Sequence, residues 1–261
     1  PAPRICPKCE SEFLYFVGEG TENIADQLAQ KFPALKIERI DRDSITRKGE
    51  LEQKLFDFAE GRIDMLVGTQ MIAKGHDFPN VTLVGVVGVD IGLGLPDLRS
   101  AERTFQMITQ VAGRSGRGEK PGRVVIQTYH PDHYALQRSM AQDYEGFYGD
   151  ELKFRENFRY PPFVALASIM VRHRDLSRAK SIANAIRRFL DAANPSKAVR
   201  IVGPASASIA RLKNEYRMQL ILRSESRREL RKVVDIALAE AEARGVEMRY
   251  VYVEIDPVSL M

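Results

Sequence analysis

Short apolar runs alternate with amphipathic helical stretches through the first 130 residues, and this alternation limits the fold more than any other feature of the 261-residue sequence. The pattern predicts strands at residues 13–17, 36–40, 65–67, 81–89 and 123–128, and helices at 21–28, 51–59 and 101–111. Strands separated by such helices form right-handed βαβ units, so we expect an α/β fold with a parallel sheet and helices on both faces. The working loops of such a sheet follow the carboxyl ends of its strands.

A second domain is expected after a helical stretch at residues 131–158. This stretch ends just before the sequence YPPF at residues 160–163. Adjacent prolines stop a helix and favour polyproline geometry. We therefore place a domain boundary here, between one domain at residues 13–158 and another at residues 159–261.

The second domain shows the order βαββαβ. Its expected strands are residues 164–171, 199–202, 216–222 and 248–255, and its expected helices are residues 176–190 and 227–243. This order is the split βαβ, or ferredoxin-like, arrangement of a smaller α+β domain. The arrangement hosts many functions, so it assigns none by itself.

Charge is divided unevenly between the two domains. Residues 1–158 carry a net charge of −4 and residues 159–261 a net charge of +8, a difference that the whole-chain value of +4 conceals. A basic second half favours nucleic acid as a partner. The alternative is a solvated surface with a few surplus arginines and lysines.

Composition excludes two classes of protein. With only two cysteines, the chain cannot build a disulfide framework, and it contains no run of roughly 18 apolar residues. We therefore expect a cytoplasmic protein with no membrane partner.

Two segments carry residue types suited to phosphate chemistry. Residues 68–78 (GTQMIAKGHDF) follow an expected strand, where polar side chains suit contacts to phosphate or to another domain. Residues 110–118 (QVAGRSGRG) follow an expected helix and carry Arg114 and Arg117 among small residues. Guanidinium groups match phosphate oxygens and stabilise charge in phosphoryl transfer. The alternatives are an ordinary strand-to-helix turn and a basic loop without a ligand, and His76 is best explained as a structural histidine.

Taken together, the two segments resemble motifs V and VI of superfamily 2 helicases, and they are most similar to those of the PriA family of replication-restart, or primosomal, helicases. The resemblance covers nearly the whole chain in the family's order. Its further motifs are residues 18–22 (GEGTE), 39–43 (RIDRD), 96–99 (PDLR), 101–103 (AER), 160–163 (YPPF), 203–204 (GP) and 216–217 (YR). It implies that residues 13–158 form the second RecA-like helicase lobe and that residues 159–261 form a DNA-binding domain.

The resemblance implies a nucleotide site shared between two RecA-like lobes. In the family, motif VI arginines reach the γ-phosphate of ATP, so Arg114 and Arg117 are the implied catalytic residues. The implied nucleotide-binding residues are Gln110, Gly113, Arg114, Arg117, Gly75 and Asp77. The sequence lacks the phosphate loop and the Asp-Glu pair that hold ATP and Mg²⁺, which belong to the first lobe in this family. We therefore expect the carboxyl-terminal portion of a longer enzyme, without ATP hydrolysis of its own.

DNA contacts are implied in both domains. Motif V of this superfamily touches the DNA backbone, and free N–H groups at a helix start near Thr21 suit a phosphate, although Thr21 could equally serve as a simple N-cap. In the second domain, cations near Tyr216 suit phosphate contact and stacking, as do those at residues 223–232. The alternative there is a solvated helix face that Glu225 and Glu229 partly neutralise. The expected DNA-binding residues are Gly18, Thr21, Thr69, Gln70, Lys74, Arg211, Lys213, Tyr216 and Arg217.

Cys6 and Cys9 form a C-x-x-C pair, which supplies two of the four ligands that a structural zinc needs. The PriA family carries several such pairs between its helicase lobes, and this pair resembles the last of them. Residues 1–12 are therefore expected to be the end of a zinc-binding region, with an incomplete Zn²⁺ site in this chain. Free cysteines or a redox motif are the alternative.

The implied function is part of an ATP-dependent 3′-to-5′ DNA helicase that recognises and remodels stalled replication forks and promotes primosome assembly and replication restart. Its implied partners are branched and single-stranded DNA, single-stranded-DNA-binding protein, and primosome and helicase-loading proteins at the bacterial nucleoid. Two alternatives remain open. One is a fork-binding and protein-docking scaffold with an inactive motor, and the other is a different duplex translocase of the same superfamily.

Overall fold

The computed structural model describes residues 20–41, 44–45, 47, 49–69, 78, 80–113 and 121–261. The chain divides into two compact units, one made of Pro1–Leu95 and Ala101–Tyr144 and the other of Pro96–Ser100 and Glu145–Met261. The second unit thus includes most of α6 (Tyr144–Asn157), which the sequence assigns to the first domain. The domain boundary after residue 158 stays a prediction.

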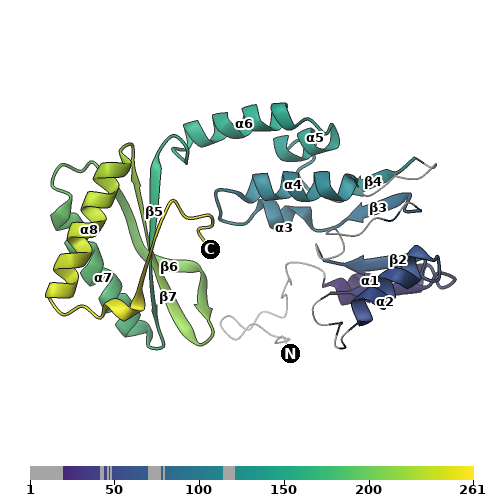
Figure 1. The fold of residues 1–261 in the computed structure, drawn as a ribbon, viewed down its shortest axis with the longest axis horizontal. Helices are drawn as coiled ribbons and strands as arrows, with labels where there is room; N and C mark the ends of the chain where they lie inside the picture. Colours follow the sequence, from purple (N-terminus) through teal and green to yellow (C-terminus); the bar gives the residue numbers. More distant parts are fainter. Residues whose placement is uncertain are drawn as a thin grey trace. The chain divides into compact units, whose positions relative to one another are not determined.

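The first unit is built from short parallel strands and the helices between them (Figure 1). Its described elements are α1 (Thr21–Lys31), β1 (Ile37–Ile40), α2 (Glu50–Ala59), β2 (Met65–Gly68), β3 (Leu83–Val86), α3 (Val89–Leu93), α4 (Ser100–Ala112), β4 (Arg123–Ile126) and α5 (Tyr134–Met140). β1 pairs in parallel with β2, and β3 pairs in parallel with β4. The predicted α/β class is confirmed, and the strand expected at 13–17 lies outside the described residues.

The strand predicted at residues 81–89 is too long. β3 ends at Val86, and α3 begins at Val89. Gly88 has a φ of +69°, a left-handed conformation that glycine adopts without strain, and it turns the chain into the helix. Val89 is buried with Ile108 and Leu136. The apolar run therefore continues from strand into helix, and periodicity cannot separate the two over so few residues.

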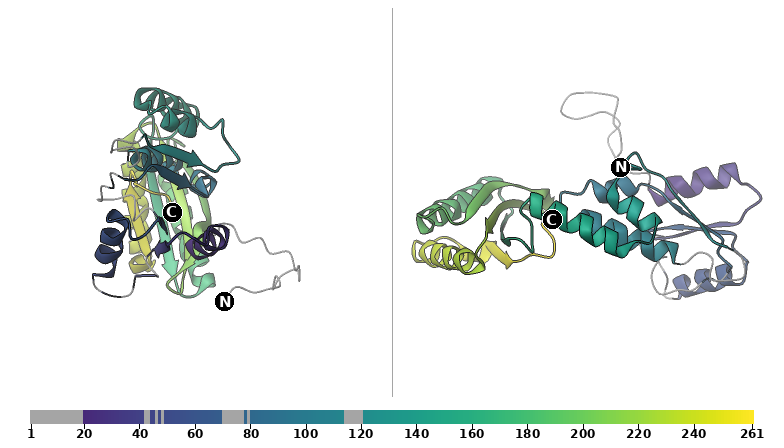
Figure 2. Two further views of the ribbon diagram at one scale, coloured as in Figure 1. Left: turned by 90° about the vertical axis from the view of Figure 1, so that its right-hand side faces the viewer. Right: turned by 90° about the horizontal axis from the view of Figure 1, so that it is seen from above.

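The second unit contains a four-stranded antiparallel sheet with two long helices side by side on one face (Figures 1 and 2). After α6 come β5 (Ala165–His173), α7 (Leu176–Ala193), β6 (Arg200–Leu212), β7 (Glu215–Ser224), α8 (Arg227–Ala243), a 3₁₀ turn (Met248–Tyr250) and β8 (Val251–Ile255). The strands lie in the order β6–β7–β5–β8, and all neighbours are antiparallel. This is the ferredoxin-like arrangement, so the predicted βαββαβ order is confirmed.

α7 and α8 bury one face of this sheet in a continuous core. Because side chains alternate along a strand, Ile169 of β5 and Leu220 of β7 both point toward the helices. They pack with Ile186 of α7 and Leu230 of α8, and all four are fully buried. None of the described helices is long and apolar enough to span a membrane.

β6 is much longer than the strand predicted at residues 199–202. Pro204 argues against a continuing strand, because proline cannot donate to the ladder. The structure accommodates it with a register shift between Val202 and Ala205, which lets β6 continue to Leu212. Lys213 and Asn214 then form the turn to β7 with positive φ values of +49° and +64°, as in a two-residue hairpin turn.

Candidate nucleic-acid interface

The start of α1 lies beside the carboxyl end of β1. Thr21 is the first residue of α1, and its hydroxyl donates a hydrogen bond to the carboxylate of Asp41. Asp41 is buried, lies 3.1 Å from the Arg39 guanidinium, and accepts from the Ser44 backbone N–H at 2.8 Å. Gly20 holds the cap position without a side-chain bond, so the simple N-cap explanation for Thr21 is wrong. Thr21 instead joins a polar network at the strand end.

Three other predicted site residues of the first unit are exposed. Thr69 directly follows β2, at the carboxyl end of the strand. Gln110 lies in the last turn of α4, and Gly113 follows that helix. α4 buries Ala101, Thr104, Phe105 and Ile108, which share one helical face. Gln110 lies off this face, so the end of α4 that leads into the predicted nucleotide loop is exposed to solvent, while the roles of these residues stay predictions.

Many predicted site residues lie outside the described part of the chain. They are Gly18, Gln70, Lys74, Gly75, Asp77, Arg114 and Arg117, together with the cysteine pair Cys6 and Cys9. Within the described residues, no group of three or more His, Cys, Asp or Glu side chains could hold a metal ion. The zinc prediction therefore depends on the cysteine pair alone and stays a prediction.

The structure divides the predicted basic cluster of the second unit between two faces of the sheet. Arg211 lies opposite Tyr216, and its guanidinium carbon is 5.0 Å from the centre of the Tyr216 ring. Lys213 is exposed at the turn that joins these two strands. These three residues form a hairpin tip. Arg217, the next residue of β7, points to the opposite face because neighbouring side chains of a strand alternate.

Arg217 lies opposite a second arginine in the sheet, which the sequence did not reveal. In the antiparallel register, Arg217 of β7 lies directly opposite Arg172 of β5. The Arg172 guanidinium carbon is 4.4 Å from the centre of the Tyr252 ring. Burial, and then the charge of Arg172, lower the pKa of the Arg217 guanidinium. Only strand register places these residues together, although the basic ends of both strands were visible in the sequence.

The first half of α8 presents a basic surface. Arg227, Arg228, Arg231 and Lys232 are exposed, while Leu230 and Val233 face the core. Cations near a helix N-terminus oppose the helix dipole, so they do not stabilise the helix itself. Glu225, expected to neutralise this helix, instead forms an ion pair with Arg159 at 2.6 Å. The exposed basic surface suits a polyanion.

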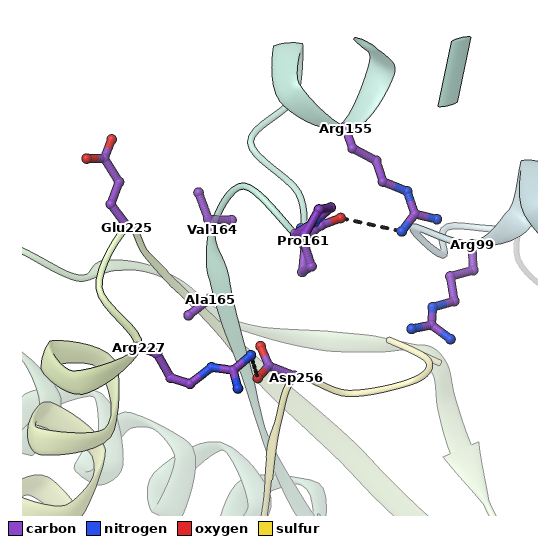
Figure 3. A pocket seen from close by; sticks show the side chains of 9 residues that line it. Arg99, Arg155, Pro161, Val164, Ala165, Glu225, Arg227 and Asp256 are labelled. Carbon is purple, nitrogen blue, oxygen red and sulfur yellow. Dashed lines mark hydrogen bonds and ion pairs between the residues drawn. The ribbon is translucent and has the colours of Figure 1, made fainter. Parts of the chain in front are cut away.

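A polar hollow of about 370 Å³ lies at the start of β5 (Figure 3). Its lining residues are Arg99, Arg155, Pro161, Pro162, Val164, Ala165, Glu225, Arg227 and Asp256. Arg227 forms an ion pair with Asp256 at 2.5 Å, and Arg155 donates to the Pro161 carbonyl at 3.4 Å. The Glu225 side chain points away from the Arg227–Asp256 pair (Figure 3). Arg155 also forms an ion pair with Glu151 at 2.7 Å, so two of the three lining arginines are compensated by carboxylates.

Comparisons with known proteins match both parts of the chain. The helicase conserved C-terminal domain matches residues 9–119, and the primosomal protein N C-terminal domain matches residues 156–258. The replication restart protein PriA of Bacillus subtilis is 44% identical over 256 residues, which is 98% of this chain and 32% of that protein. PriA of Synechocystis sp. is 41% identical over 99% of this chain, which is 30% of that protein. PriA of Haemophilus influenzae is 40% identical over 99% of this chain, which is 35% of that protein. The chain thus spans about a third of the length of these relatives.

Proposed function

The chain belongs to the PriA family of replication restart proteins, and on this premise we propose that it supplies the second motor lobe and the terminal DNA-binding domain of an ATP-dependent 3′-to-5′ DNA helicase. The helicase recognises and remodels stalled replication forks and promotes primosome assembly and replication restart. The proposal is carried by the presence of both matched domains, helicase and primosomal, in one chain. The 44% identity across 98% of the chain supports it.

In the proposed mechanism, the end of α4 leads motif VI to the nucleotide. Gln110 and Gly113 are exposed there, and Arg114 and Arg117 follow in the sequence. The arginines stabilise charge on the γ-phosphate as finger residues, and Gly75 and Asp77 complete the nucleotide contacts. The first lobe of such a helicase would bind most of the ATP and Mg²⁺, and Cys6 and Cys9 would supply part of a Zn²⁺ site.

We further propose that the lobe contacts the DNA backbone through residues near its strand ends. Thr21 is held there by Asp41, and Thr69 lies exposed after β2. Gly18, Gln70 and Lys74 complete this set. In the second unit, the hairpin tip and the basic start of α8 supply positive charge for branched DNA.

The proposed partners are branched and single-stranded DNA, single-stranded-DNA-binding protein, and primosome and helicase-loading proteins. The proposed location is the bacterial cytoplasm at the nucleoid. The net charge of +8 on residues 159–261 supports a polyanionic partner for the terminal domain.

The test of the motor is Arg114→Ala in the full-length protein. Loss of a finger arginine should reduce DNA-stimulated ATP turnover roughly 1,000-fold, measured by phosphate release, while fork binding changes little. Lys31→Ala, an exposed cation of α1, is the matched control and should leave turnover unchanged. Unchanged turnover in the Arg114 variant would remove this residue from its proposed role.

The same assay separates the motor from the scaffold alternative. A full-length protein that binds forks but shows no DNA-stimulated turnover is a docking scaffold with an inactive motor. The 261-residue chain by itself should show no turnover in either case, because it lacks the phosphate loop.

A further inference from the structure

Arginines oppose one another on the sheet face opposite to α7 and α8. The register places Arg172 opposite Arg217, and Arg200 opposite Arg223. Directly opposed side chains of neighbouring strands have Cβ atoms about 5 Å apart, and like charges at this distance repel. Two such pairs on one face therefore weaken the sheet unless an anion compensates them.

Neither Arg172 nor Arg217 forms an ion pair with any described residue. The Nε–H groups of both are buried and lack a hydrogen-bond acceptor within the described part of the chain. Arg217 is only 6% exposed, and its guanidinium donates a long hydrogen bond from Nη1 to the Ile209 carbonyl at 3.5 Å. Buried charged donors without acceptors are unfavourable, so the pair has unused capacity for an anion.

The positions of both guanidinium groups are fixed by their surroundings. Arg172 stacks on Tyr252, with 4.4 Å between the guanidinium carbon and the ring centre. Arg217 is enclosed near Ile209 of β6. Tyr252 itself is 46% exposed, so part of its ring is open to solvent. Donors that are already fixed lose little entropy when they bind a ligand.

We propose that the Arg172–Arg217 pair binds phosphate groups of a nucleic-acid strand on the sheet face opposite to α7 and α8, with Tyr252 as a stacking surface for a base. This inference rests on the proposed function, because it names the face of the terminal domain that contacts DNA. Exposed aromatic rings beside cations are the usual platform for single strands.

The second arginine pair favours a polyanion over a single carboxylate. Arg223 lies six residues beyond Arg217 on β7, which is about 20 Å at roughly 3.4 Å per residue. Arg223 also stacks on a tyrosine, with its guanidinium carbon 4.6 Å from the centre of the Tyr160 ring. Leu260 packs between the pairs, against Ile221. A nucleic-acid strand that contacts both arginine pairs therefore passes over the C-terminal residues of the chain.

The test measures binding of a fluorescein-labelled 20-nucleotide poly-dT strand by fluorescence anisotropy, from 50 to 200 mM salt. Arg172→Gln and Arg217→Gln should each weaken binding about tenfold and make the slope of log K against log salt shallower by about 0.7. Tyr252→Ala should weaken binding severalfold without changing this slope. Arg188→Gln, an exposed arginine on α7 and thus on the other side of the sheet, is the control and should bind like wild type.

Thermal unfolding separates this role from a purely structural one. Removing one of two opposed arginines relieves repulsion, so Arg172→Gln should keep or raise the Tm while it weakens binding. A lowered Tm with unchanged affinity would show that the pair is structural and would overturn the inference. If Arg217→Gln does not fold, the affinity of Arg172→Gln for poly-dT is decisive, because Arg172 is only partly buried. A tenfold loss of affinity supports the inference, and an unchanged affinity overturns it.

Two outcomes separate the inference from the proposed function. If the wild-type chain binds no DNA, the proposed DNA-binding role of the terminal domain fails and the inference fails with it. If wild type binds but both glutamine variants bind equally well, the inference alone is wrong. Tighter binding of a poly-glutamate peptide than of poly-dT, lost in Arg172→Gln, would assign the pair to an acidic protein partner and also overturn the inference.

Discussion

The two units of the chain are stabilised in different ways. In the second unit, one sheet face and two helices share a continuous core that includes Ile169, Leu220 and Leu230. In the first unit, the described buried residues form smaller separate clusters, such as the one around Ile40 and Leu55. Burial of apolar area is the main stabilising contribution to folding. We therefore expect the second unit to be the more stable of the two.

The candidate site residues of the two units also lie on different kinds of backbone. Of the described site residues in the first unit, Thr69 follows β2 and Gly113 follows α4. In the second unit, Arg172 and Arg217 lie within paired strands. Sites on strands are held more rigidly than sites on loops. The arginine pair of the second unit is therefore held by the sheet on both sides.

The largest expected effect comes from deleting core volume. Leu220→Ala should cost about 4 kcal/mol, because its neighbours in the continuous core cannot close the cavity. Leu55→Ala in the first unit should cost about 2 kcal/mol, because its cluster is small. Amide hydrogen exchange read by mass spectrometry reports the loss in each unit separately. Equal losses of stability in Leu220→Ala and Leu55→Ala would contradict the expected difference between the two units.

An effect smaller than that of Leu220→Ala is expected where the backbone of the second unit packs closely. Gly203 has a φ of +96°, and a Cβ atom there would lie 2.5 Å from the Gln219 carbonyl oxygen. Gly203→Ala should therefore cost about 3 kcal/mol, from the strained φ and the clash together. The opening free energy of β6 and β7 amides in hydrogen exchange is the measurement.

Two glycines serve as controls for this substitution. Gly245 in the second unit and Gly61 in the first also have positive φ, but a Cβ atom would meet nothing within 4 Å at either. Alanine at these positions should cost only about 1 kcal/mol, from the backbone term alone. If Gly203→Ala lowers the stability no more than the controls do, the close approach of Gly203 to Gln219 is not a source of stability.

The smallest effect concerns a carboxylate that joins α3 to the end of β4 in the first unit. The Thr128 hydroxyl, which donates to Asp90 at 2.6 Å, and then the Tyr129 N–H, hold the pKa of Asp90 below its ordinary value. The stabilisation is therefore present above about pH 4, the ordinary range of the carboxyl, and is lost as pH falls through the lowered pKa. Asp90→Asn should cost a few tenths of a kcal/mol at pH 7.

Thermal unfolding followed by circular dichroism at pH 7 and pH 2.5 checks this prediction. The Tm difference between wild type and Asp90→Asn should shrink at the lower pH. Thr128→Val should reduce the same pH dependence, because it removes the main donor. A difference that is equal at both pH values would show that the charge on Asp90 contributes nothing.

Much of the fold could be predicted because its signals are local. The helix at residues 227–243 agrees with α8 at both ends, since Ser226 accepts from the Glu229 N–H and caps it. The βαββαβ order was also readable, since period and turn residues are properties of neighbouring positions. The length of β6 could not be predicted from the sequence, because a register shift in its pairing with β7 accommodates Pro204.

The candidate site was predictable only in part. Gln110 and Arg114 were predicted from the resemblance to motif VI, and Thr21 was predicted at a helix start. The tie between Thr21 and Asp41 was not found, because the two are twenty residues apart and meet only at the strand end. Arg211 and Arg217 were grouped as one basic cluster, although strand alternation sends them to opposite faces.

The sequence by itself thus determined the order of elements, the uneven charge and the family, because composition, periodicity and motif spacing do not depend on distant contacts. Tertiary structure decided which side chains face one another. Arg172 and Arg217 are 45 positions apart, and only the register of β5 on β7 makes them opposing neighbours. Register is fixed by burying one face of the sheet under α7 and α8, so the core on that face determines which charges meet on the other.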